Sequence, residues 1–363
     1  MTTPLAEQRL QRLRQACSQA GINTLIVYGN AWTCDYLRYA TGFGSLEGHA
    51  LALVTADTVQ LFLESQAEAE RAAAEAGHNQ IECLPDFWPS LRRTVAEREA
   101  LGVAPLAHLP QGLAGAVAAR AVDFSGPFQQ LLMDKLDGEV DAVRRAAALA
   151  DEGYEVFRAA AREGRTEVEV IAELEGFFRS RGCPDNFMIM ASGGREVRAM
   201  HPPGSKRLQR GDLVTTELTP CVDGYYAQIC RTLVIGPPSA EQQQAFDVHL
   251  EALEAGMALL KPGITAGELA RVQNDVFRRH GLGDYVTSEY TRVRGHGLGL
   301  YVDSRPAILE EDRTVIEDGM TIIVHPNGYH PASGYLVLGD AVVVRASGNE
   351  VLTRTPRQLF VAG

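Results

Sequence analysis

The sequence has no apolar run long enough to cross a membrane and no excess of positive charge. No segment approaches the roughly 18 consecutive apolar residues that mark a transmembrane helix. The 363 residues include 34 Lys and Arg against 46 Asp and Glu, which gives a formal net charge of −12. Nucleic-acid binding requires clustered cations that contact phosphates. We therefore expect neither a membrane nor a nucleic-acid partner, and a small-molecule substrate fits the composition better.

The sequence shows no CxxC pair of cysteines, and we expect no secretion signal in its first residues. The 6 cysteines form no CxxC motif, and most lie in apolar or helical runs, which is typical of reduced, buried thiols. Residues 1–22 place Leu and Ile at helical spacing among Arg and Gln, instead of a basic start followed by an apolar core. These absences predict a cytoplasmic protein.

The length of 363 residues exceeds one ordinary hydrophobic core and favours two domains. In the first part, short apolar runs alternate with helical stretches; the runs lie at 24–29, 50–54, 59–63 and 101–104, and the helical stretches near 65–76, 89–100 and 111–120. This alternation predicts a small α/β domain with a mixed sheet. We place its boundary after residue 137, so the expected domains are 1–137 and 138–363.

The second part places polar residues on strands and between helices. Thr166 and Glu169 form a capping box for a helix that we expect to end near Arg181. An apolar run at 186–191 follows, and two further helices are expected at 240–260 and 265–280. The residues after 280 alternate short apolar runs with glycine-rich turns. This pattern predicts an α+β domain.

One hairpin, from Gly211 to Thr232, carries an acid in a strand that otherwise reads as buried. Glu217 lies among Leu, Val and Thr, and the chain turns back at Asp223 and Gly224. Burying a carboxylate is costly unless it is paired or hydrogen-bonded. Glu217 is therefore either part of a site or a satisfied structural acid.

The motifs of the chain, taken in order, resemble those of the creatinase, aminopeptidase P and prolidase family. The matching segments are DYLRYATGF in the first part and His201, GDLV, GYYAQICRT, KPGIT, RGHGLG, GM and HPNGY in the second. The resemblance covers nearly the whole chain. It implies an α+β protein with a C-terminal pita-bread domain behind a smaller α/β creatinase-type N-terminal domain. By analogy, it also implies a homodimer.

The resemblance also implies where a metal centre would lie. Family metallopeptidases bind two metal ions through Asp, Asp, His, Glu and Glu, and the matching positions here are Glu217, Gln228, His296, His325 and Gly339. Only the histidine at 296 is retained. Bridging carboxylates offset the charge of two ions, and both bridging positions have lost theirs. We therefore expect the two-metal centre to be absent.

The first functional hypothesis is a creatinase-like hydrolase that cleaves a C–N bond in a small amino-acid-like or amidino substrate, without a cofactor. His201 matches the histidine that creatinase, a metal-free family member, is thought to use as general acid and base, a role that imidazole suits near neutral pH. The predicted catalytic residues are His201, Glu217, His296 and His325. Four more polar residues are predicted to bind substrate: Gln228, Asp303, Arg198 and Arg294.

Two alternatives remain open at this point. One is an enzyme with a single divalent transition metal ion (Fe, Mn or Zn) held by Glu217, His296 and His325, acting as a hydrolase, lyase or oxygenase. The other is a non-catalytic relative of Xaa-Pro peptidases that uses its pocket to bind a peptide or a partner.

Overall fold

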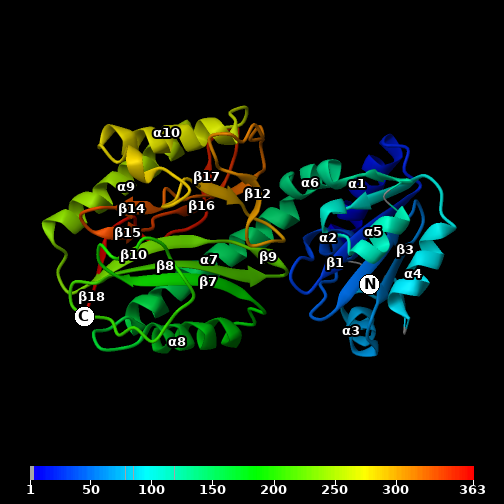
Figure 1. Cartoon of the computed structure of the whole chain (residues 1–363), viewed down its shortest axis with the longest axis horizontal. Helices are drawn as coiled ribbons and strands as arrows, with labels where there is room; N and C mark the ends of the chain where they lie inside the picture. Colours follow the sequence, from blue (N-terminus) through cyan, green and yellow to red (C-terminus); the bar gives the residue numbers. More distant parts are fainter. Residues whose placement is uncertain (1–3, 78, 85, 118) are drawn as a thin grey trace. The chain divides into compact units, whose positions relative to one another are not determined.

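The computed structural model describes residues 4–77, 79–84, 86–117 and 119–363. The chain divides into two compact units, residues 1–138 and 139–363. The division falls inside helix α7 (Asp137–Ala160), one residue beyond the boundary expected from the sequence. Each unit has its own hydrophobic core. Figure 1 shows the elements of both units in the colours of the sequence.

The first unit is built on a mixed six-stranded sheet with the order β4-β3-β2-β1-β5-β6. Its strands are β1 (Thr24–Asn30), β2 (His49–Val54), β3 (Val59–Leu63), β4 (Gln80–Cys83), β5 (Leu101–Ala104) and β6 (Ala121–Asp123). β1 pairs antiparallel with β2 and parallel with β5. The predicted mixed sheet is thus confirmed.

The helices of the first unit are α1 (Pro4–Gln19), α2 (Asp35–Thr41), α3 (Gln66–Ala76), α4 (Phe87–Ala96), α5 (Gln111–Val117) and α6 (Ser125–Met133), with a 3-10 turn, η1 (Leu106–His108). Helix α4 ends at Ala96, before the predicted residue 100, and Ala100 itself has a φ of 47°, outside the right-handed helical region. The predicted helical positions 1–3 and 118 lie outside the described residues.

The second unit contains two five-stranded sheets and a small hairpin. The first sheet has β7 (Asn186–Gly193), β8 (Leu213–Val222), β9 (Tyr225–Tyr226), β10 (Ile229–Ile235) and β18 (Phe360–Ala362). The second sheet has β11 (Gly295–Gly297), β12 (Ser304–Ala307), β13 (Thr321–Val324), β16 (Asp340–Val343) and β17 (Glu350–Val351). The hairpin is β14 (Gly328–His330) with β15 (Gly334–Leu336).

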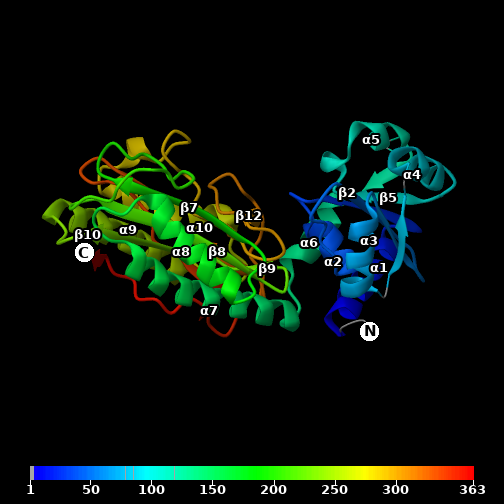
Figure 2. The same cartoon turned by 90° about the horizontal axis from the view of Figure 1, so that it is seen from below.

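Four helices cover the outer faces of these sheets. Figures 1 and 2 show α7 and α8 (Glu167–Ser180) along the sheet of β7, β8 and β10, and Figure 1 shows α9 (Ala240–Leu259) and α10 (Ala266–Arg279) on the side of the other sheet. A short turn, η2 (Gly283–Tyr285), follows α10. The capping box of Thr166 and Glu169 opens α8 as predicted. The helices thus leave the facing surfaces of the two sheets to form a site.

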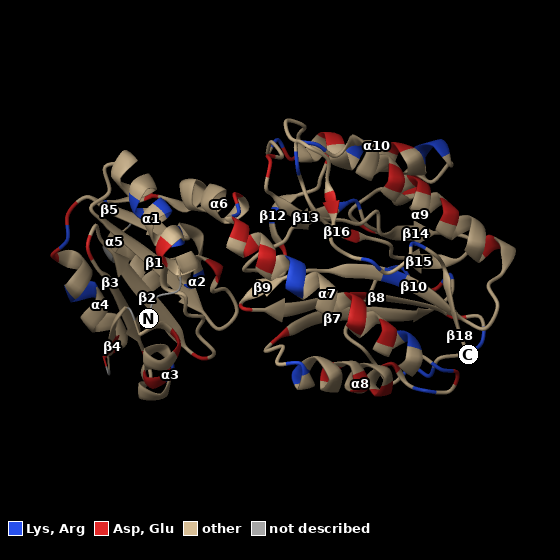
Figure 3. Ribbon diagram, turned by 180° about the vertical axis from the view of Figure 1, so that it is seen from behind, with Lys and Arg blue, Asp and Glu red and all other residues tan. Residues whose placement is uncertain are grey.

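Charged residues lie mainly on the helices and turns of the second unit, and its strands are largely uncharged (Figure 3). This distribution makes the few charged side chains inside the unit notable, because a buried charge requires a partner. Within the described ranges, no helix is both long and apolar enough to span a bilayer.

Candidate functional site

The candidate site lies where the two sheets of the second unit meet. Cys230 on β10 and Gly339, which precedes β16, exchange backbone hydrogen bonds of 3.3 and 3.0 Å. On the adjacent strand β8, Glu217 is paired in register with Cys230. The predicted hairpin turn, with φ angles of 51° at Asp223 and 84° at Gly224, brings these two strands together. An acid therefore lies beside the contact between the sheets.

Two side-chain amides donate hydrogen bonds to the Glu217 carboxylate. Gln228 Nε2 donates to Oε2 over 2.9 Å, and Asn327 Nδ2 donates to Oε1 over 2.5 Å. Asn327 is held in this orientation because its Oδ1 accepts from the backbone N–H of Leu338 at 3.1 Å. These bonds offset part of the cost of burying the carboxylate and fix its direction.

The acid–base behaviour of Glu217 is shifted toward neutral pH. Burial, with a smaller contribution from the negative charge of Asp303, raises the pKa of Glu217 to about 7. Hydrogen bonds from Cys230, Gln228 and Asn327 partly oppose this rise. A carboxyl group with such a pKa can both accept and release a proton near pH 7, as a general base or acid must.

Two buried histidines lie together on the second sheet. His296 is on β11 and His325 follows β13, and their ring centroids are 5.3 Å apart with the planes at 68°. His296 Nδ1 lies 2.9 Å from the carbonyl oxygen of Gly297; because a carbonyl only accepts, this nitrogen donates and Nε2 carries the lone pair. Burial lowers the pKa of both histidines, so both rings are neutral at pH 7.

Two polar atoms of the site have no hydrogen-bond partner among the residues that the structure describes. They are Oε1 of Gln228 and Nδ1 of His325, in residues that are only 2% and 6% exposed. Buried polar atoms are normally satisfied within a protein or by water. Both atoms therefore have hydrogen-bonding capacity that the described residues do not use.

The lack of a side chain at Gly339 makes room for His325. A Cβ atom at residue 339 would lie 2.5 Å from Cβ of His325 and 2.9 Å from the carbonyl oxygen of Val324. Both distances are well below the roughly 3.5 Å of a normal contact between such atoms. A glutamate at this position would therefore require the backbone after β13 to move.

Arg231 holds the backbone of this region in place. Its Nη1 donates to the carbonyl oxygen of Gly339 over 2.6 Å, and its Nη2 bonds the Asp340 carboxylate over 2.7 Å. Asp340 also accepts from Arg357. Although burial alone would raise the pKa of Asp340, Arg231 and Arg357 outweigh it and lower that pKa. The segment that carries Gly339 is thus fixed by a buried ion pair.

These residues do not fit a metal ion in this arrangement. Glu217 accepts from two amide nitrogens, which are donors with no lone pair for a metal ion. Within the part of the chain that the structure describes, no three His, Cys, Asp or Glu side chains lie close enough together to hold one. The set of Glu217, His296 and His325 that the sequence suggests for a single metal ion is therefore not assembled as a ligand set.

His201 lies on the loop next to the site. Its backbone pairs with that of Met190 on β7, the strand adjacent to β8. The His201 side chain is exposed, and its Nδ1 donates to the carbonyl oxygen of Pro202 over 2.8 Å. The neutral ring then offers Nε2 as an acceptor. The structure shows no direct contact between His201 and Glu217.

Two of the predicted substrate-binding residues, Asp303 and Arg198, have exposed side chains. The side chain of Asp303 is 72% exposed, and its Oδ1 lies 3.7 Å from His296 Nδ1. Arg198 lies 3.5 Å from Glu289 and has its guanidinium carbon 5.7 Å from the centre of the Tyr290 ring. Both side chains are free enough to contact a substrate.

Arg294 has a different environment from the one expected. It is buried, and its guanidinium donates to Asn274 Oδ1 (2.5 Å) and to the carbonyl oxygens of Asn327 (2.5 Å) and Thr291 (3.1 Å). Burial lowers its pKa to about 10. These contacts explain Arg294 as a structural residue that braces the segment with Asn327, and they give no support to the predicted bond with a substrate carboxylate.

Asn327 is the site residue that sequence reasoning missed. It lies two residues after His325 in the HPNGY motif, where a turn is the obvious interpretation. One feature of the sequence could have identified Asn327: it follows a buried strand and lies close to a predicted site histidine. Its bond to Glu217 joins residues 110 positions apart.

Comparisons with known proteins agree with this architecture. Residues 9–132 match the creatinase/prolidase N-terminal domain, and residues 141–346 match metallopeptidase family M24. The chain is 27% identical over 364 residues to an Xaa-Pro dipeptidase of Pyrococcus horikoshii, which covers 98% of this chain and 99% of the relative. It is 30% identical over 274 residues to a putative dipeptidase of Bacillus subtilis, covering 75% of this chain and 74% of the relative.

A solved structure shows the same relationship. The crystal structure of an X-Pro aminopeptidase from Thermotoga maritima matches with a TM-score of 0.87 at 25% identity, over 97% of this chain and 99% of that one. The predicted family and its fold, a creatinase-type N-terminal domain followed by a pita-bread domain, are thereby confirmed. The chain belongs to metallopeptidase family M24.

Proposed function

We propose that this chain is a metal-independent hydrolase of a C–N bond in a small amino-acid-like or amidino substrate. The observation that carries the proposal is the buried Glu217 carboxyl group, held by Gln228 and Asn327 at the junction of the sheets. Its pKa near 7 and the neutral rings of His296 and His325 supply proton transfer and hydrogen bonding from protein groups alone. Dipeptidase and aminopeptidase relatives also hydrolyse C–N bonds.

Glu217 is the proposed base. Its carboxylate takes a proton from a water molecule as the water oxygen forms a bond to the substrate carbon that carries the scissile nitrogen. The amides of Gln228 and Asn327 keep the carboxylate in one orientation, so less reorganisation is needed when the proton moves.

His201 is the proposed acid. As the C–N bond breaks, the leaving nitrogen takes the electron pair and receives a proton from the His201 imidazolium. The proton gained by Glu217 and the proton lost by His201 balance over one cycle through solvent. The substrate itself would span the two residues, since they make no direct contact.

The unpartnered atoms of the site are the proposed anchors for substrate. Oε1 of Gln228 accepts an N–H of the amide or amidino group, and Nδ1 of His325 forms a second bond to the same end of the molecule. Asp303 suits a substrate ammonium group, and Arg198 suits a carboxylate. Arg294 is left out of the proposal because its guanidinium is engaged inside the protein.

A single-metal enzyme is the second candidate. It is favoured by the membership in a metallopeptidase family and by the unpartnered nitrogen of His325, since imidazole nitrogen is a common metal ligand. Against it stands the lack of a converging ligand set in the described residues.

The test is turnover by the purified chain after treatment with a chelator, with N-substituted amino acids, dipeptides and amidino compounds as substrates. We expect activity to survive chelation and to fall by roughly 100- to 10,000-fold in Glu217→Gln. Glu82→Gln, an exposed change on β4, is the control and should be fully active. Activity only after metal addition would favour the single-metal enzyme, and binding without turnover would favour a non-catalytic relative.

A further inference from the structure

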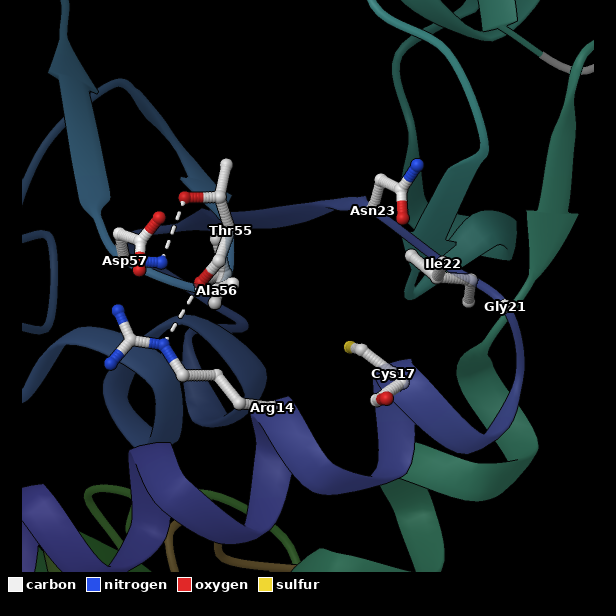
Figure 4. Close-up of a pocket in the computed structure, with 10 residues that line it drawn as sticks. Arg14, Cys17, Gly21, Ile22, Asn23, Thr55, Ala56 and Asp57 are labelled. Atoms are coloured by element: carbon white, nitrogen blue, oxygen red, sulfur yellow. Dashed lines mark hydrogen bonds between the residues drawn. The ribbon is translucent and has the colours of Figure 1, made fainter.

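The first unit contains a hollow of about 350 Å³ that the proposed hydrolysis does not use. It lies between the end of α1 and the turn that joins β2 to β3, as Figure 4 shows. Its volume is at the lower end of the range of small-molecule sites. The hollow is large enough for a molecule the size of an amino acid.

The guanidinium of Arg14 lies at one end of the hollow, and some of its N–H donors are unused. Arg14 Nε donates to the carbonyl oxygen of Thr55 over 2.9 Å, which fixes the guanidinium. Among the described residues, no acceptor is bonded to its two terminal nitrogens. Burial lowers the pKa of Arg14, and the charge of Asp57 only partly opposes this. A partly desolvated guanidinium of this kind favours a bound anion, and a carboxylate matches its fork geometry.

A carboxylate lies at the same end. Figure 4 shows Asp57 beside the guanidinium of Arg14. Their charges interact, yet within the described ranges no ion pair joins the two side chains. Asp57 is placed by its backbone N–H, which donates to Thr55 Oγ1 over 3.4 Å. Two opposite charges that are close but not bonded to each other suit a ligand that carries both signs.

The remainder of the hollow combines apolar and uncharged polar side chains. Figure 4 shows the sulfur of Cys17 pointing into it, with Ile22 and Asn23 at the end away from Arg14. Burial raises the pKa of Cys17 to about 11, so the thiol is neutral and packs as a small apolar group. Val54 also lines the hollow, together with the polar side chains of Ser18 and Asn23. Such a surface accommodates a short aliphatic side chain.

We propose that this hollow binds a small free amino acid, with the ligand carboxylate on Arg14, its ammonium group on Asp57 and its side chain against Cys17 and Ile22. The binding itself does not depend on the proposed hydrolysis. If that hydrolysis is correct, the ligand belongs to the same chemical class as the product released in the second unit.

The test is calorimetric titration of the full chain with L-alanine and L-valine. Each charge-assisted contact that is lost should raise the dissociation constant by about tenfold or more. We therefore expect Arg14→Gln and Asp57→Asn each to bind the amino acid at least about tenfold more weakly than the wild type. Valine amide and isovalerate each lack one of the two charged groups and should bind as poorly. Arg93→Gln, an exposed arginine on α4 bonded to Ser90, is the matched control and should bind like the wild type.

The same titration in Glu217→Gln separates this site from the candidate active site. Binding that persists in Glu217→Gln and is lost in Arg14→Gln supports the hollow as the site. No binding by the wild type, or binding that is unchanged in both Arg14→Gln and Asp57→Asn, would overturn the proposal. Binding lost only in Glu217→Gln would also overturn it, by placing the amino acid in the second unit. Thermal unfolding of each variant shows whether it is folded.

Discussion

At the scale of single residues, the chemistry of the candidate site depends on how Glu217 is held. Its two oxygen atoms each accept an amide N–H, from Gln228 and Asn327. Burial favours the protonated acid, whereas these hydrogen bonds favour the carboxylate. Burial is the larger effect, and the pKa settles at about 7, above the ordinary 4.5. The outcome is an acid that is poised to exchange protons at neutral pH.

This raised pKa predicts a specific pH dependence of stability. Between about pH 4.5 and 7 the folded chain keeps a proton on Glu217 that the unfolded chain releases. The contribution of Glu217 to the free energy of unfolding is therefore fully present below about pH 4.5 and is lost as the pH rises through about 7. We expect Glu217→Gln, which cannot ionise, to lose less stability than the wild type between these values, by about 1.4 kcal/mol for each unit of pKa shift.

The measurement is the free energy of unfolding in urea, determined for the wild type and for Glu217→Gln between about pH 4.5 and 7. His296 and His325 have lowered pKa values, so their effect has the opposite sign and is lost as the pH falls. Since both histidines are present in both proteins, the difference between the two curves isolates Glu217. Parallel curves would mean that the pKa of Glu217 is not raised.

His201 provides the second residue-scale prediction. If it donates the proton to the leaving nitrogen, His201→Asn should lower kcat by roughly 100-fold or more, since asparagine cannot titrate. KM and stability should change little, because among the described residues the exposed His201 side chain bonds just the neighbouring Pro202 carbonyl oxygen. Steady-state kinetics on any substrate identified by the screen gives the answer. If His201→Asn were largely active, His201 would not be the proton donor, and its role would be to stabilise its loop.

At the scale of the elements, the segment from Val337 to Asp340 determines what the site can hold. Gly339 lies against His325 and Val324, and Arg231 donates to the Gly339 carbonyl oxygen and to the Asp340 carboxylate. The segment is therefore held both by packing and by hydrogen bonds. A glutamate introduced at Gly339 would not simply supply a metal ligand, because its Cβ would lie too close to His325 and to the Val324 carbonyl oxygen.

Gly339→Ala tests this confinement. Adding one methyl group to a packed region costs roughly 1–3 kcal/mol, and the Arg231 contacts restrict relaxation. Gly176→Ala in α8 is the matched control: a Cβ atom added there would meet nothing within 4 Å, and alanine in a helix is favoured over glycine by up to about 1 kcal/mol. Equilibrium unfolding in urea should show opposite signs for the two changes. If Gly339→Ala left the free energy of unfolding unchanged, the segment around residue 339 would be shown to move easily enough to accept a Cβ atom.

The elements were largely predictable from the sequence, whereas the site was predictable only in part. Capping boxes and the turn at Asp223 and Gly224 are local signals, so α8 and the hairpin of Glu217 were found directly. Asn327 was missed because its contact with Glu217 spans 110 positions. Arg294 was expected at the substrate because a sequence pattern does not reveal that a guanidinium is surrounded by backbone carbonyls.

At the scale of the whole molecule, the chain has the two-domain fold of its M24 relatives. Matches to both family domains cover residues 9–132 and 141–346, so the scaffold is that of the relatives. At the junction of its two sheets, the second unit brings together the Glu217 carboxyl group, the amides of Gln228 and Asn327 and the imidazoles of His296 and His325. The predicted homodimer and the predicted cytoplasmic location remain predictions at this scale.

The central claim is that this site works without a metal ion. The direct measurement is titration of the chelator-treated chain with Mn²⁺, Co²⁺ and Zn²⁺, with elemental analysis of the protein afterwards and the Xaa-Pro dipeptidase of Pyrococcus horikoshii as the comparison. We predict well under one ion per chain, and the same value for Glu217→Gln, because two amides occupy the carboxylate and the described residues offer no converging ligand set. One or two tightly bound ions per chain, lost in Glu217→Gln, would contradict the account.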